Sequence, residues 1–66
     1  MLEGVIESFD ERRGDGVFLS DDGVRLYFHC VAISDGSRQI TTGVRARARR
    51  IVGRLGRDEA DEVSSL

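Results

Sequence analysis

Tyr27 and His29 carry the side chains of this sequence that are best suited to a flat, polar ligand. They stand two apart in residues 24–29, where apolar and polar side chains alternate, so a strand would place both on one face. A phenol ring and an imidazole on one exposed face can stack on the bases of a single-stranded nucleic acid. The alternative interpretation is that both are ordinary half-exposed residues of a sheet.

The sequence shows no convincing pattern of catalytic or metal-binding residues. No spacing typical of a nucleophile, a base and an acid occurs among the candidates Ser8, Ser20, Asp21 and His29. His29 and Cys30 are the only histidine and cysteine, and they cannot supply the four ligands of a usual zinc site. We therefore predict that the chain is not an enzyme and binds no metal, other cofactor or small-molecule substrate.

All ten basic residues are arginines, and they are unevenly distributed. Residues 1–36 carry eight acidic residues and three arginines, residues 37–57 seven arginines and no acidic residue, and residues 58–66 four acidic residues. The arginines of the middle stretch, among them Arg45, Arg47 and Arg49, could bind phosphates, could solvate a sheet edge and deter aggregation, or could pair with the acidic residues across a hairpin. The pairing is favoured, since the acidic residues lie within one turn of the arginine-rich strand.

Five short strands are expected to position these residues. Strands are predicted at residues 3–9, 16–19, 24–29, 44–49 and around 59–63. The connections are predicted as a polar turn at 10–14, a hairpin turn at 21–23, a helical turn at 31–33, a loop at 34–37 and a turn at 53–56.

The fourth strand has one irregularity and one competing interpretation. Arg50 breaks the alternation of apolar residues and arginines, so we expect a β-bulge near Arg49 and Arg50 that restores the inward phase. A helix over residues 44–55 competes, because arginine and alanine favour helices. The strict alternation and the glycines at 43, 53 and 56 weigh against the helix.

Five strands with a longer third-to-fourth connection predict an all-β fold, a small five-stranded antiparallel Greek-key barrel of the OB type. The 66 residues allow one domain, residues 1–66, with the expected core Ile6, Phe18, Leu26, Phe28 and Ile33. A single cysteine and no apolar run of membrane-spanning length favour a cytoplasmic protein that does not bind membranes. We expect a monomer or a weak dimer.

Two motifs resemble the cold-shock domain family. Gly14-Asp15-Gly16-Val17-Phe18 is similar to that family's Lys-Gly-Phe-Gly-Phe-Ile motif, and Leu26-Tyr27-Phe28-His29-Cys30-Val31-Ala32-Ile33 is similar to its Val-Phe-Val-His-Phe-Ser-Ala-Ile motif. With one deletion before Gly36 and one insertion near Arg49-Arg50, the resemblance extends over essentially the whole chain and adds Ile40 to the inward positions. It implies an OB-fold that binds single-stranded RNA or DNA, in a transcriptional or post-transcriptional role.

The resemblance also implies which residues would bind. Phe9 and His29 are retained, Tyr27 and Val17 stand where the family has exposed phenylalanines, and arginines stand where it has lysines. The predicted nucleic-acid-binding residues are therefore Phe9, Arg13, Val17, Tyr27, His29 and Arg38. For Phe9 the alternative is a core position, because so small a barrel has few large residues to spare.

Much of the family's aromatic binding face is replaced here. The aromatic positions now hold Ser8, Asp15, Val17, Cys30 and Ser37. At about 1 kcal/mol for each lost stack, the affinity falls on the order of several thousandfold, and the carboxylates of Glu7 and Asp15 repel phosphate. The sequence therefore predicts weak binding of single-stranded nucleic acid, and the alternative is a barrel that now serves protein interaction or self-association.

Overall fold

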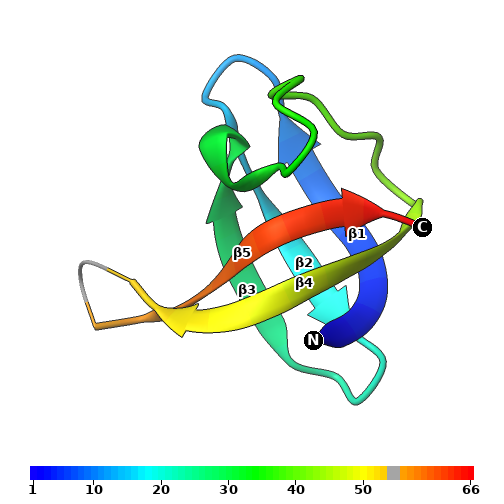
Figure 1. Ribbon diagram of the computed structural model, residues 1–66, viewed down its shortest axis with the longest axis vertical. Helices are drawn as coiled ribbons and strands as arrows, with labels where there is room; N and C mark the ends of the chain where they lie inside the picture. Colours follow the sequence, from blue (N-terminus) through cyan, green and yellow to red (C-terminus); the bar gives the residue numbers. More distant parts are fainter. Residues whose placement is uncertain (54–55) are drawn as a thin grey trace.

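The computed structural model describes residues 1–53 and 56–66, and these form a closed all-β barrel (Figure 1). Its five strands are β1 (Leu2–Asp10), β2 (Asp15–Ser20), β3 (Arg25–His29), β4 (Arg45–Val52) and β5 (Asp58–Ser65). The order around the barrel is β1-β2-β3-β5-β4, which is consistent with an OB-fold-like barrel. The predicted fold class and all five predicted strands are confirmed.

One pair of neighbouring strands is parallel. β3 and β5 pair in parallel through Tyr27 and Glu59, whereas the other four pairs of neighbours are antiparallel. A closed ring with an odd number of strands cannot alternate in direction throughout, so at least one parallel pair is required. This pair brings Glu59, at the start of β5, beside Tyr27.

The core fills the inside of the barrel. Its largest fully buried side chains are Phe18, Phe28, Ile6, Leu26 and Val63. Ile33 is also buried, so the predicted core is confirmed, and Ile40 packs against it while partly exposed. The buried residues of β4 are alanines, and β5 contributes Ala60 beside Val63, so small side chains leave room for the two large rings.

β1 changes its inward phase at Glu7. Ile6 lies opposite Phe18 and Ser8 lies opposite Val17, so β1 has one extra residue, Glu7, between two consecutive residues of β2. Such a bulge bends the strand and re-aims the side chains that follow it. Ser8 is therefore exposed, and Phe9 lies opposite buried Gly16.

The bulge of the β4–β5 pair lies on β5. Arg47 lies opposite Ser64 and Arg49 opposite Asp61, so β5 has one residue more than β4 between these pairs. Glu62, in this interval, has the left-handed backbone angle φ of 50°. The predicted bulge at Arg49 and Arg50 is wrong, because the register is regular from there to the end of β4.

Arg50 therefore keeps the phase of the alanines before it on β4. It is nevertheless exposed. The β4–β5 hairpin extends past the other strands at its turn (Figure 1). A break in the pattern of one strand cannot show which of the two paired strands carries the extra residue. In this pair the extra residue is on β5.

The connections agree with the sequence where they are described. A 3-10 turn, η1 (Cys30–Ala32), stands one residue before the predicted helical turn, and residues 45–52 form a strand rather than the competing helix. The turn predicted at 53–56 includes residues 54 and 55, which lie outside the described residues. Within the described ranges, no helix has the length and apolarity to span a membrane.

Candidate nucleic-acid interface

Three of the predicted binding residues share the outer face of β1, β2 and β3. Val17 lies opposite both Ser8 on β1 and Tyr27 on β3, so these residues form one row across the three strands. His29 lies in the next row, opposite Asp15. Tyr27 is 52% exposed, so this face presents an aromatic surface on β3.

A shallow cavity of about 380 Å³ opens beside Tyr27. Its lining residues are Arg13, Asp15, Tyr27, Phe28, His29, Arg57 and Glu59. Arg13, from the β1–β2 turn, therefore joins Tyr27 and His29 as predicted. The cavity also includes two residues near the start of β5, which the β3–β5 pairing brings to this place.

Sequence reasoning missed Arg57 as part of this site. Its guanidinium carbon Cζ lies 5.0 Å from the centroid of the Tyr27 ring. This distance is within the range of a cation–π contact. Arg57 is 30 positions from Tyr27 in the chain, and only the parallel pairing of Tyr27 with Glu59 brings it close.

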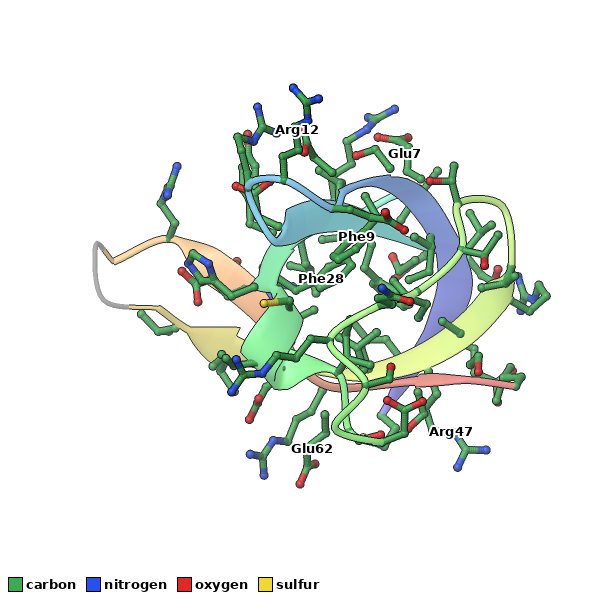
Figure 2. The ribbon with its side chains drawn as sticks, turned by 90° about the horizontal axis from the view of Figure 1, so that it is seen from above. Glu7, Phe9, Arg12, Phe28, Arg47 and Glu62 are labelled. Atoms are coloured by element: carbon green, nitrogen blue, oxygen red, sulfur yellow. The ribbon has the colours of Figure 1, made fainter. Side chains whose placement is uncertain are left out.

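Phe9 lies at the interior edge of the barrel. Its ring stacks on that of Phe28, with centroids 5.9 Å apart and an angle of 8° between the planes (Figure 2). Gly16 makes this arrangement possible, because a Cβ atom there would lie 2.9 Å from the Phe28 ring. Phe9 is half-buried and contributes to the core, as in its alternative interpretation.

Arg38 lies apart from this cavity. It is exposed on the connection between η1 and β4, with a left-handed φ of 61°, and does not line the cavity beside Tyr27. The six predicted residues are therefore not one cluster. Arg13, Tyr27 and His29 line one cavity, and Val17 lies next to Tyr27 on the same face.

Carboxylates on this face hold the arginines that could bind phosphate. Nε of Arg13 donates to Asp15 at 3.1 Å, and Nε of Arg25 donates to Glu7 at 2.8 Å. The hydrogen bond and charge of Glu7 raise the pKa of Arg25. Glu7 and Asp15 therefore neutralise neighbouring arginines.

The β1–β2 turn beside the cavity is organised by Asp10. Its carboxylate accepts hydrogen bonds from the backbone N–H groups of Arg13 and Arg12, at 3.1 and 2.9 Å. These two bonds favour the charged form and lower the pKa of Asp10. They fix the backbone from which Arg13 extends.

The arginines of β4 meet carboxylates from two directions. Arg49 donates to Asp61 at 3.0 Å, and Arg50 pairs with Asp58, so the predicted pairing with the acidic end of the chain is confirmed for these two. It is wrong for Arg45, whose two terminal nitrogens donate to Asp21 at 2.7 and 2.9 Å.

Asp21 directly follows β2. Because β1 pairs with β2 on one side and with β4 on the other, Asp21 lies near Arg45 on β4. Arg45 therefore pairs with this carboxylate and not with one from β5. Among the described residues Arg47 has no ion pair, and it points away from the barrel (Figure 2).

The described residues contain no cluster of three or more His, Cys, Asp or Glu side chains that could hold a metal ion. No known protein family matches this chain, and no curated protein matches it either. The structure is consistent with an OB-fold-like barrel, and the resemblance to the cold-shock family rests on the two sequence motifs.

Proposed function

We propose that this chain is a divergent cold-shock-like protein that binds single-stranded RNA or DNA weakly through the outer face of β1, β2 and β3. The observation that carries the proposal is the exposed ring of Tyr27, which shares this face with His29 and borders a cavity of about 380 Å³. Arg13 and Arg57 also line this cavity, so two positively charged side chains lie beside the ring. The motifs that resemble the family lie on β2 and β3, the strands that form this face.

Weak affinity follows from the number of aromatic rings. The chain has three phenylalanines and one tyrosine, and all three phenylalanines are buried or half-buried. Stacking on a single ring supplies about 1–3 kcal/mol, whereas nucleic-acid-binding OB-folds use several such rings along the strand. The ion pairs of Arg13 and Arg25 reduce the phosphate attraction further.

A second candidate function is protein interaction or self-association. The observation in its favour is the neutralised outer surface, where most of the arginines on the described strands form ion pairs with carboxylates. A surface of alternating, paired charges attracts polyanions little, and it is compatible with a protein partner of complementary pattern.

Titration of a fluorescent oligothymidine at low and high salt separates the two. Tyr27→Ala removes the exposed phenol ring and is expected to weaken binding by about fivefold or more, the equivalent of 1 kcal/mol or more for one stack. Val52→Ala is the control, because Val52 is 72% exposed on β4 and does not line the Tyr27 cavity. Binding that is equal in parent and Tyr27→Ala would exclude Tyr27 as the stacking surface.

A gain-of-binding variant tests the same face in the other direction. Asp15 and Val17 point outward on β2, so Asp15→Phe with Val17→Phe adds two rings beside Tyr27. We expect at least tenfold tighter binding, from about 1 kcal/mol or more for each stack. Asp15→Asn alone isolates the effect of the lost charge, and a folded double variant with unchanged affinity would favour the protein-partner function.

A further inference from the structure

We infer that Arg57 covers one face of the Tyr27 ring in the free protein, so that a base stacking on this face must displace the guanidinium group. Arg57 then acts as an intramolecular competitor of the nucleic acid at this ring. This inference rests on the proposed function, since it concerns how the same site is occupied before a ligand arrives.

The backbone of Arg57 is fixed on both sides of the contact. The N–H of Gly53 donates to the carbonyl oxygen of Arg57 at 2.7 Å, which closes the base of the hairpin connection. Two residues later, Glu59 pairs with Tyr27 across the parallel strands. The fold therefore holds the backbone of Arg57 within reach of the Tyr27 ring.

The guanidinium group occupies the volume that a base would need. It lies 5.0 Å from the ring centroid, and stacked aromatic groups have centroids about 4.5–7 Å apart. A base and the guanidinium group cannot both fill this space on one side of the ring. Among the described residues no carboxylate forms an ion pair with Arg57, so its described partner is the ring itself.

Removal of Arg57 has two opposite effects, which a matched variant separates. Arg57→Gln frees the ring but also deletes a positive charge, which by itself weakens binding to phosphates. Arg12→Gln deletes the same charge from an exposed arginine of the β1–β2 turn, which points outward (Figure 2) and does not line the Tyr27 cavity. The difference between the two variants therefore reports the competition for Tyr27.

Both variants and the parent are to be titrated with oligothymidine, and the accessibility of Tyr27 is to be measured separately. We expect Arg57→Gln to bind about two- to fivefold more tightly than Arg12→Gln, the fold-change equivalent to an exposed cation–π contact. Tyr27 is the only tyrosine and there is no tryptophan, so intrinsic fluorescence reports this one ring. Quenching by acrylamide is expected to increase in Arg57→Gln and to stay at the parent's level in Arg12→Gln.

The outcomes distinguish failure of the inference about Arg57 from failure of the proposed nucleic-acid binding. If the parent binds oligothymidine but Arg57→Gln binds no more tightly than Arg12→Gln, Arg57 is a ligand contact or a bystander, and the inference is overturned. Unchanged quenching in Arg57→Gln also overturns it, because the ring was then not covered. If neither the parent nor any variant binds, the proposed function fails and the competition fails with it.

Discussion

At the scale of single residues, every arginine on a described strand except Arg47 forms an ion pair with at least one carboxylate on the outer surface. Arg25 is held by Glu7, Arg13 by Asp15 and Arg45 by Asp21, each through hydrogen bonds of about the length expected for charged partners. Because these groups are exposed, each pair contributes little to stability. Their larger effect is on recognition, since a phosphate must compete with a carboxylate that is already in place.

The pair of Asp21 and Arg45 predicts a pH dependence of stability. The hydrogen bond from Arg45 lowers the pKa of Asp21, so this carboxyl group stabilises the folded state above its unfolded pKa of about 3.9 and loses that contribution as pH falls through the lower folded value. We expect the Tm to fall below about pH 4, and Asp21→Asn to lose less Tm than the parent over this range. Glu11→Gln serves as the control, since Glu11 has no ion pair within the described ranges.

Equal losses of Tm on acidification in the parent and in Asp21→Asn would contradict a role for this pair. Asp10 and Asp35 also have lowered pKa values, from backbone hydrogen bonds of the turns that they organise, so part of the acid sensitivity is expected to remain in either variant.

At the scale of elements, two arginines on the β4 strand of the β4–β5 hairpin differ in the charge of the residues that face them. Arg47 and Arg49 both point outward from β4, two residues apart. Arg49 meets Asp61 and also Glu62, whose bulge position on β5 brings its carboxylate to 3.6 Å from the guanidinium group. Arg47 lies opposite Ser64, which offers no charge.

This contrast predicts different effects of the same substitution. Arg49→Gln is expected to lower the free energy of unfolding by a few tenths to about 1 kcal/mol, the range of exposed ion pairs, whereas Arg47→Gln should change it by less than about 0.5 kcal/mol. Urea denaturation of both variants and the parent measures this. In oligothymidine titrations we expect neither variant to change the slope of log affinity against log salt, because the binding face lies on β1, β2 and β3. A slope flatter by about 0.7 in Arg47→Gln would instead place a phosphate on Arg47.

At the scale of the whole molecule, one narrow core supports both the barrel and the binding face. The molecule extends 24 × 23 × 17 Å, and a small set of side chains inside it must fill the barrel. Phe28 belongs to that core, carries the stacked ring of Phe9 and lies directly after Tyr27 on β3. The outward ring of Tyr27 is therefore positioned by the inward packing of its neighbour.

Truncation of Phe28 is expected to unfold the protein. Phe28→Ala should lower the free energy of unfolding by about 3–5 kcal/mol, because a large buried ring is lost and a cavity remains. A domain of this size has little more stability than that, so the amide NMR signals should lose their dispersion at ambient temperature. Phe28→Leu keeps an apolar side chain and should remain folded with reduced stability. A fully dispersed spectrum of Phe28→Ala, with parent-like stability, would show that Phe28 is not essential to the core.

The sequence alone determined the strands, the inward phase of β3 and most of the core. The alternation of apolar and polar side chains is a local property with a period of two residues, so it places Leu26 and Phe28 inside and Tyr27 and His29 outside without knowledge of the partner strands. The glycine-containing turn after β2 is likewise a local signal.

The tertiary structure decided the register and therefore the composition of the site. The bulges at Glu7 and Glu62 depend on which residues face each other across a strand pair, and no single strand's pattern contains that information. The bulge at Glu7 turned Phe9 from the outer face toward Phe28. The barrel closes through the parallel pairing of β3 with β5, two strands that are far apart in the chain. This pairing brings Arg57 to Tyr27, and it could not be read from either strand alone.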